Sequence, residues 1–470
     1  MADLAALKRA LGDRLIVPSN PQYPSAAQLF DPRFDGVHPA AIARCASTSD
    51  VQRCLEFVRT TGTPLAPRSG GHSYGGYSTT SGLVIDVGPM NAIGPGKSPG
   101  TARIGAGARL TDVYAELAAS GTSIPAGSCP TVGITGLALG GGIGVVGRKY
   151  GLTCDAITAV EVVTAGGELV RCDENTEPDL FWAHRGGGGG NFGVVTALEF
   201  RTHQTRSLSY FLVRWEWAHA HDVVTAWQSW LPTTPDELWA SLHLDGAASA
   251  SDSPHVYVSG VFVGDLAGLQ HQLDELQSAA KAPMSSRFAK ETDYLHTMMI
   301  EGGCADLSAA QCRPVSEGGK LTRASQLARS DFIAQPLSSS GIDVALSALD
   351  ARRTTGLHGG GVLFDAYGGA INQVGATETA FAHRDKLACL QYVTPIFAAA
   401  QTKPNQAWLD DLYAAMRPHV SGYAYQNYID PELTDWQHAY YGVNLARLIS
   451  VKSKYDPDDL FRFAQSVPKR

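Results

Sequence analysis

The chain has 470 residues, a net charge of −8 and a hydrophobic content of 44%. The negative charge argues against nucleic acids and anionic membranes as partners, and no apolar run reaches the roughly 18 residues of a membrane-spanning helix. A chain of this length is too long for one compact core, so we expect at least two domains.

Residues 1–205 are typical of a domain built from short strands and helices joined by glycine turns. Residues 1–11 predict an amphipathic helix, and residues 49–58 predict a second helix, capped by Ser49 or Asp50. Alternating apolar residues and turn residues predict the other elements. These are strands at 40–45, 83–87, 102–108 and 194–200, a helix at 111–119, and a hairpin of 157–164 with 168–172.

The pattern changes after residue 205 to longer alternating strands and amphipathic helices, which predict one large sheet with helices on one face. The predicted strands are 209–217, 238–244, 255–263 and 359–367, and the predicted helices are 221–231, 265–280, 339–351 and 406–416. Near the C-terminus, residues 440–454 predict one further amphipathic helix.

The eight cysteines bear on the cellular compartment. Cys304 and Cys312 lie close together in a polar loop and predict a disulfide, whereas Cys45 and Cys54 are as readily free thiols as a pair. The chain begins with a helix rather than a signal peptide, which points to the cytoplasm. A disulfide points instead to an oxidising compartment and a removed signal. We leave both possibilities open.

Two glycine-rich loops each carry one residue able to bond covalently to an electrophilic cofactor. His72 lies in the loop 66–75, and Cys129 lies in the loop 125–133. Glycine lets backbone N–H groups approach a phosphate or a flat ring, because no Cβ intervenes. Taken singly, either residue would more often be a buried structural side chain. Two of them in two such loops favour a cofactor link.

A third glycine run, residues 140–144, suggests a dinucleotide-binding fold at first sight. No βαβ unit surrounds the run, so we reject that interpretation. The histidines and cysteines show no spacing typical of metal ligands, and we predict no metal site.

Together these motifs resemble the berberine-bridge-enzyme-like branch of the vanillyl-alcohol-oxidase flavoproteins, and within it the glucooligosaccharide and chitooligosaccharide oxidases. The resemblance extends over nearly the whole chain, including a Trp-Ala-x-Arg-Gly-Gly-Gly-Gly segment at 182–189. It implies an α+β fold with a PCMH-type FAD-binding domain and a substrate domain whose large antiparallel sheet is covered by helices. The implied boundaries are 1–205 for the FAD domain, 206–420 for the substrate domain, and 421–470 for a segment that returns to the FAD domain.

The same resemblance implies that FAD is attached twice, by His72 to its 8α carbon and by Cys129 to its C6. The other positions that match FAD contacts of the family lie in the glycine loops and near the C-terminus. They are Arg68, Ser69, Gly70, Gly71, Ser73, Ser128, Val132, Gly133, Gly136, Gly140, Gly141, Gly142, Gly144, Val195, Tyr425 and Asn427.

Tyr428, in Asn427-Tyr428-Ile429-Asp430, and Asp365, shortly before a Gly-Gly pair, match the catalytic residues of the sugar oxidases. A hydride leaves carbon readily only if the neighbouring hydroxyl gives up its proton. A free tyrosine, with a pKa near ~10, is a poor base, so the two side chains must titrate as a coupled unit. Tyr74 and Gln391 match substrate-contacting positions and suit sugar stacking and hydroxyl recognition.

The implied activity is oxidation of the anomeric C1 hydroxyl of a reducing mono- or oligosaccharide to a lactone, with hydride transfer to flavin and reduction of O2 to hydrogen peroxide. We therefore expect a monomer whose partners are a small carbohydrate and O2, with no nucleic acid and no membrane.

Two other functions stay open. Gly361 and Leu363 stand where the sugar oxidases have Trp and Gln, and this difference supports a second hypothesis. Under the second hypothesis, the protein is an oxidative tailoring enzyme, with the same doubly attached FAD, that acts on an alkaloid, a polyketide or a glycosylated natural product. The third hypothesis is a flavoprotein that binds a ligand without turnover. The presence of both Tyr428 and Asp365 argues against it. Whether O2 or another acceptor takes the electrons is also open.

Overall fold

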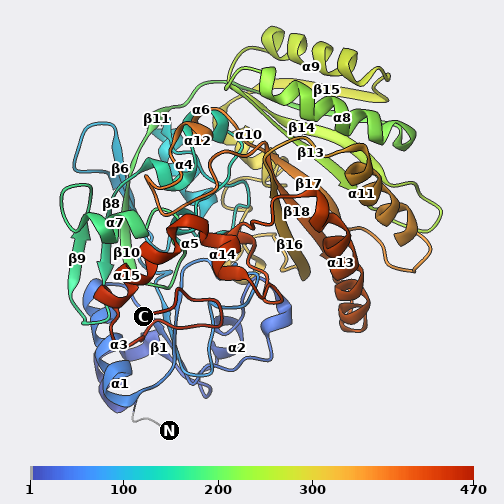
Figure 1. Cartoon of the computed structure of the whole chain (residues 1–470). Helices are drawn as coiled ribbons and strands as arrows, with labels where there is room; N and C mark the ends of the chain where they lie inside the picture. The colour runs from blue at the N-terminus through green and yellow to red at the C-terminus, as the bar shows by residue number, and fades with distance from the viewer. Residues whose placement is uncertain (1–3) are drawn as a thin grey trace.

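The computed structural model describes residues 4–470, and its first sheet is formed by the N-terminal part of the chain (Figure 1). The strand order across this sheet is β1-β2-β4-β3, in which β2, β4 and β3 run parallel to one another and β1 pairs with β2 in the antiparallel direction. The strands are β1 (Leu15–Ile16), β2 (Ala41–Arg44), β3 (Leu65–Arg68) and β4 (Leu83–Asp86). Because β2, β4 and β3 run parallel, their C-terminal ends lie at one edge of the sheet, where the His72 loop begins.

The helices beside this sheet are α1 (Ala5–Leu11), α2 (Tyr23–Ala26) and α3 (Thr48–Thr61). Residues 1–3, part of the first predicted helix, lie outside the described residues. The predicted cap of α3 was wrong. Ser47 is the N-cap, and its side chain accepts from the Asp50 N–H while the Asp50 carboxylate accepts from the Ser47 N–H. The helix begins earlier than predicted, because this reciprocal capping box satisfies two free N–H groups at once.

A second, antiparallel sheet follows in the order β5-β6-β10-β8-β9. Its strands are β5 (Ile93–Pro95), β6 (Thr101–Gly105), β8 (Ile157–Val163), β9 (Leu169–Cys172) and β10 (Val194–Arg201), and a short pair is formed by β7 (Thr122–Ser123) with β11 (His203–Gln204). The helices of this part are α4 (Leu110–Ala119), α5 (Ile134–Leu139), α6 (Gly147–Tyr150) and α7 (Pro178–Ala183). The predicted hairpin is confirmed as β8 and β9. The glycine run at 140–144 follows α5 rather than a strand, unlike a dinucleotide-binding loop.

The middle of the chain forms a seven-stranded antiparallel sheet in the order β15-β12-β14-β13-β17-β18-β16. Its strands are β12 (Leu208–Trp215), β13 (Leu238–Asp245), β14 (His255–Phe262), β15 (Ser286–Thr292), β16 (Gln326–Ile333), β17 (Gly361–Ala366) and β18 (Ala388–Pro395). The sequence predicted β12, β13, β14 and β17 but missed the other three. β15 is a mostly exposed edge strand, and β16 and β18 are largely buried on both faces, so none of the three alternates clearly.

The four helices predicted for this part are confirmed, and they cover one face of the large sheet (Figure 1). They are α8 (Ala220–Trp230), α9 (Leu266–Ala280), α11 (Ser339–Arg352) and α13 (Thr402–Met416). Trp227 of α8 packs edge-on against Phe364 of β17, with 5.8 Å between ring centroids. Because neighbouring strand residues point to opposite faces, Leu363 and Asp365 point away from these helices. The short helices α10 (Tyr294–Glu301) and α12 (Ala370–Gln373) complete this part.

The C-terminal segment lies against the N-terminal part of the molecule (Figure 1). The Lys452 Nζ donates to the Asn191 carbonyl at 3.0 Å, and the Val467 N–H donates to the Asn191 side chain at 2.8 Å. The single helix predicted at 440–454 is two, α14 (Trp436–Tyr441) and α15 (Leu445–Tyr455), because Gly442 between them has a left-handed φ of 47°. The domain boundaries at 205 and 420 stay a prediction.

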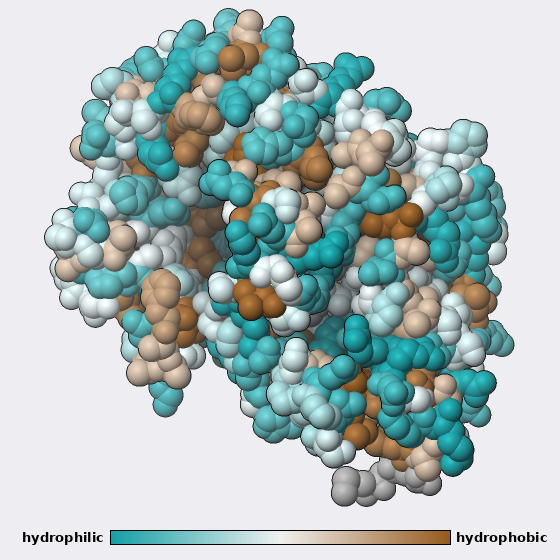
Figure 2. All heavy atoms as spheres, turned by 180° about the vertical axis from the view of Figure 1, so that it is seen from behind, coloured by the Kyte–Doolittle hydropathy of each residue, from teal (hydrophilic) through white to brown (hydrophobic). Residues whose placement is uncertain are grey.

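Hydrophobic residues on the face shown in Figure 2 form scattered groups among hydrophilic ones. The most exposed large ones are Phe397 and Val443, at 75% and 71%. Within residues 4–470, no helix combines the length and apolar character needed to cross a bilayer.

A buried ion pair joins the segment after the 140–144 glycines to the segment before β18. Arg384 donates to both carboxylate oxygens of Asp155, at 2.6 and 2.8 Å, and both side chains are less than 10% exposed. We expect Asp155→Asn to lower the free energy of unfolding by roughly 3–5 kcal/mol, because it leaves the Arg384 charge buried without a counter-ion.

Chemical denaturation of this variant and of Asp179→Asn measures the effect. The Asp179–Arg447 pair is about half exposed on both sides, so its loss should cost less than about 1 kcal/mol. Equal losses in the two variants would contradict a structural role of the buried pair.

Candidate active site

A cavity of about 1060 Å³ lies between the N-terminal part, the large sheet and the C-terminal loops. Most residues that the sequence singled out line it, although they come from three distant parts of the chain. They are Arg68, Ser69, Gly70, Gly71, His72, Ser73, Tyr74, Ser128, Cys129, Val132, Gly133, Gly136, Val195, Gln391, Tyr425, Asn427 and Tyr428.

The structure does not bring the glycines of the 140–144 run to the cavity wall: Gly140, Gly141, Gly142 and Gly144 lie outside the lining, and only Ile143 of the run reaches it. The Gly142 and Ile143 N–H groups donate to the Tyr425 hydroxyl, at 2.9 and 3.2 Å. A Cβ on Gly140 would overlap the Asn427 side chain. The run therefore holds the segment that contains Tyr428.

The two predicted cofactor loops pack against each other backbone to backbone. A Cβ on Gly70 would overlap the Gly133 N, and a Cβ on Gly133 would overlap the Gly70 N and the Ser69 Oγ. Neither position therefore accommodates a larger residue while the loops keep this distance. The contact brings His72 and Cys129 to one cavity.

The cavity fits a pyrophosphate and a flat ring. The backbone N–H groups of residues 69–73 have no acceptor in the described part of the chain, and all five residues line the cavity. Such a row of free amides is suited to an anion. Gly136, Gly189 and Gly190 also line the wall, and a Cβ on any of them would meet no atom closer than 3.8 Å. They leave space for a planar group.

His72 is held as a neutral imidazole. Its Nε2 lies 2.8 Å from the Thr131 Oγ1, and its ring stacks on Phe30 with 4.1 Å between centroids. Burial, and secondarily the positive charge of Arg109, lowers the pKa of His72 to about 3. When Nε2–H donates to Thr131, Nδ1 keeps its lone pair for bonding to a cofactor.

The Cys129 loop is anchored on the first turn of α4. The Thr111 N–H and hydroxyl both donate to the Pro130 carbonyl at 3.1 Å, and the side chain of Cys129 is exposed to the cavity. Desolvation of the thiol by the surrounding protein, followed by the charge of Asp365, raises its pKa. The Cys129 thiol must therefore lose its proton before its sulfur can bond covalently to a cofactor.

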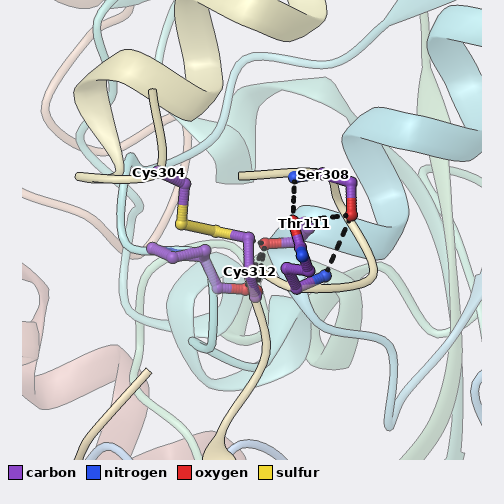
Figure 3. Close-up of a disulfide and its surroundings, with 6 residues drawn as sticks. Thr111, Cys304, Ser308 and Cys312 are labelled. Carbon is purple, nitrogen blue, oxygen red and sulfur yellow. Dashed lines mark hydrogen bonds between the residues drawn. A yellow bond between two sulfur atoms is a disulfide. The ribbon is translucent and has the colours of Figure 1, made fainter. Parts of the chain in front are cut away.

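A disulfide lies behind this anchor, as Figure 3 shows. Cys304 and Cys312 are bonded, as the sequence predicted, and the Thr111 hydroxyl also lies 3.4 Å from the Cys312 carbonyl. Cys45 and Cys54 are neighbours with 3.8 Å between their sulfur atoms, but they are free thiols. The disulfide closes the loop 304–312, and the contact with Thr111 holds this loop against the anchor of the Cys129 loop.

Tyr428 and Asp365 form a direct hydrogen bond of 3.1 Å, in which the phenol donates to the carboxylate. Asp365 lies behind Tyr428, outside the cavity lining. Burial raises the pKa of Asp365 to about 6, and burial together with the Asp365 charge raises the pKa of Tyr428 well above its usual range. A free tyrosinate is thus disfavoured, whereas the carboxylate is a base near neutral pH.

Tyr74 and Gln391 form a second polar group beside this pair. The Tyr74 ring lies parallel to that of Tyr428 with 5.7 Å between centroids, and the Gln391 Nε2 donates to the Tyr74 hydroxyl at 3.2 Å.

Several lining residues were missed from the sequence. Gln326 lies on β16, a strand that the sequence did not reveal, and residues 458–463 also line the cavity. Glu301, next to the lining residue Gly302, has one carboxylate oxygen that is buried without a hydrogen-bond partner in the described residues, and burial raises its pKa to about 7. No local sequence pattern marks such a residue. Among the residues described, no three His, Cys, Asp or Glu side chains are grouped as for a metal ion.

Comparison with known proteins gives the family. A domain family described as "FAD binding domain" matches residues 39–173, and one described as "Berberine and berberine like" matches residues 424–468. The chain is 32% identical over 466 residues to the uncharacterized FAD-linked oxidoreductase YgaK of Bacillus subtilis (strain 168), with 98% of each chain covered. The chain belongs to the berberine bridge enzyme-like FAD-linked oxidoreductases.

Two further relatives support this assignment. A chitooligosaccharide oxidase of Gibberella zeae is 32% identical over 453 residues, with 91% of this chain and 87% of the relative covered. The structure of BBE-like 1 from Physcomitrella patens superimposes with a TM-score of 0.90 at 30% identity and covers 100% of this chain and 99% of its own. The berberine bridge enzyme-like protein described here is therefore an enzyme that binds FAD, with the predicted PCMH-type fold.

The contact between the two loops can be tested at Gly133. We expect Gly133→Ala to reduce the flavin content of the purified enzyme several-fold, because its Cβ would push the His72 and Cys129 loops apart. The ratio of flavin absorbance to protein absorbance measures the change. Gly36→Ala is the control, since an added Cβ there meets nothing within 4 Å. Full flavin loading of the Gly133 variant would contradict the importance of the contact.

Proposed function

We propose that this enzyme oxidises the anomeric C1 hydroxyl of a reducing mono- or oligosaccharide to a lactone and passes the electrons to O2. The observation that carries the proposal is the hydrogen bond between Tyr428 and Asp365, 3.1 Å long, at the wall of the cavity that also contains His72 and Cys129. The similarity to a chitooligosaccharide oxidase supports a carbohydrate as the substrate class.

In this proposal, His72 and Cys129 hold FAD through two covalent bonds, to the 8α carbon and to C6. The free amides of residues 69–73 receive the pyrophosphate, and Gly136 lies against the ring system. When bound, FAD supplies the two-electron acceptor that takes the C1 hydride and is reoxidised by O2 to give hydrogen peroxide. Double attachment allows the cavity to stay wide, because the cofactor cannot dissociate.

Tyr428 and Asp365 move the hydroxyl proton as one unit. Tyr428 faces the cavity and accepts the substrate proton while it gives its own to the Asp365 carboxylate, with which it is already hydrogen-bonded. This relay avoids a buried tyrosinate beside a carboxylate, which the raised pKa of Tyr428 makes costly. Asp365, with a pKa of about 6, is the final proton acceptor.

Tyr74 and Gln391 bind the sugar beside this pair. The Tyr74 hydroxyl accepts from the Gln391 Nε2, which leaves the Gln391 amide oxygen available to accept from a sugar hydroxyl. The Leu363 side chain in the same lining offers an apolar contact instead of a further polar one. The ring to be oxidised is thus fixed mainly from the Tyr74 side.

Covalent attachment predicts the behaviour of three variants. His72→Ala and Cys129→Ala should each keep FAD bound to the polypeptide after acid precipitation, because the other bond remains. The double variant should release all its flavin. Flavin absorbance in the pellet and the supernatant distinguishes the three. Complete release from either single variant is the result that would refute double attachment.

The Asp365 base predicts a pH dependence of flavin reduction under anaerobic conditions. The rate should rise as the pH increases through about 6, because only the ionised carboxylate accepts the proton. Asp365→Asn should remove this rise and slow reduction by about 100-fold or more, with little change in sugar affinity.

Stopped-flow absorbance at varied sugar concentration separates the rate of reduction from binding. Glu301→Gln is the matched control, since it removes a second carboxyl of raised pKa, about 7, which has no hydrogen bond to Tyr428 among the described residues. The proposed role of Asp365 fails if the two variants lose the same pH inflection or if Asp365→Asn weakens binding as much as it slows reduction.

Peroxide release in air from a panel of reducing mono- and oligosaccharides tests the function itself. Turnover that requires a free anomeric hydroxyl is the expected result, and its dependence on sugar length shows how much of the cavity is used. A flavin that is reduced without peroxide release identifies a dehydrogenase. A flavin that stays oxidised with every sugar contradicts the proposal and favours a tailoring oxidase for natural products.

A further inference from the structure

A second cavity, of about 560 Å³, shares the loop of residues 68–72 as a wall with the first. It lies at the C-terminal ends of the parallel strands β2, β4 and β3, whose last residues are Arg44, Asp86 and Arg68. These three residues are aligned in register, with Asp86 opposite Arg44 on one side and Arg68 on the other. The carboxyl ends of parallel strands are a common place for ligands to bind.

The lining of this cavity carries positive charge that the protein does not neutralise. Three of its arginines are paired with carboxylates: Arg109 with Glu317, Arg313 with Asp112, and Arg323 with Asp35. Of the other two, Arg68 has one carboxylate nearby, that of Asp86 at 3.6 Å, and Arg44 has none within ion-pair distance in the described residues. The local excess of positive charge contrasts with the net charge of −8 of the whole chain.

The Arg68 guanidinium has free donors on this side of the loop. The residue is 5% exposed, and its Nε and Nη2 are buried without a hydrogen-bond partner in the described part of the chain. Its nearest polar neighbours, Asp86 and the Gln28 carbonyl, belong to the second cavity and not to the first. Buried cationic donors are costly when unpaired, so a ligand that accepts from them is favoured.

We infer that the second cavity binds a small molecule through a phosphate-type oxoanion held by Arg68 and Arg44. A guanidinium offers paired N–H donors that match two oxygens of such a group. The inference rests on the proposed function for the place of FAD: Cys129, one of the two proposed attachment residues, lines the larger cavity and not the second one, so FAD belongs to the larger cavity. The volume lies in the range of small-molecule sites, so the ligand carries an organic part beside the anion.

Calorimetric titration of the FAD-loaded enzyme with inorganic phosphate and with a hexose phosphate tests the inference, at about 0.15 M NaCl to screen unspecific attraction. We expect both to bind. Arg44→Gln should weaken binding about tenfold or more, because it removes one charged partner. Asp86→Asn should strengthen binding, because it removes the competing carboxylate. Arg53→Gln is the matched control: it changes the same charge at an exposed position of α3 and should bind as the unchanged enzyme does.

The opposite signs expected for Arg44→Gln and Asp86→Asn separate a specific site from general destabilisation, and the flavin content of each variant is measured in parallel. Binding of inorganic phosphate but not of the hexose phosphate supports the oxoanion site but overturns the inferred organic part of the ligand. Absence of binding by both probes, or equal affinities of the Arg44 and Arg53 variants, overturns the inference. Loss of FAD from Arg44→Gln also overturns it, because the cavity would then belong to the cofactor.

Discussion

The contact of Gly70 with Gly133 is the constraint on which the rest of the site depends. His72 follows a parallel strand of the first sheet, and Cys129 lies in the loop that is anchored on α4. Their loops come from different elements, and only the absence of both Cβ atoms lets the two backbones touch. Thr131 strengthens the contact, since its hydroxyl meets His72 while its carbonyl accepts from Arg109 at 3.0 Å. One cavity with two reactive side chains is the consequence.

The same type of constraint positions Tyr428. Asn427 donates to the Leu137 carbonyl at 2.9 Å and to the Tyr425 hydroxyl at 2.8 Å, and it lies where a side chain on Gly140 would be. The glycine run thus fixes the C-terminal segment against α5, and Tyr428 follows directly. Asp365 reaches Tyr428 from the large sheet. The pair therefore exists only when three separate parts of the chain are assembled.

The sequence predicted those features that are local. The His72 and Cys129 loops, the hairpin of β8 and β9, and the four covering helices each carry their own periodicity or turn residues. The residues of the 140–144 run look like cofactor contacts in sequence. A glycine that makes room for a ligand has the same sequence pattern as one that makes room for the Asn427 side chain, and only the folded structure shows which of the two lies there. The strands β16 and β18 are buried on both faces and lack alternation, so Gln326 could not be placed. The raised pKa of Glu301 results from burial by distant segments, which no local pattern records.

Charges of opposite sign lie at the two ends of this arrangement. Burial and the charge of Arg109 favour a neutral imidazole at His72, and burial and the charge of Asp365 oppose ionisation of Cys129. The two residues that we propose as links to FAD therefore differ in protonation, since His72 has a free lone pair at any physiological pH while the Cys129 thiol must first give up a proton. The carboxylate that raises the thiol pKa is the one that accepts the proton of Tyr428 in our proposal. In that proposal, the charge of Asp365 thus bears on both the attachment of the cofactor and the oxidation of the substrate.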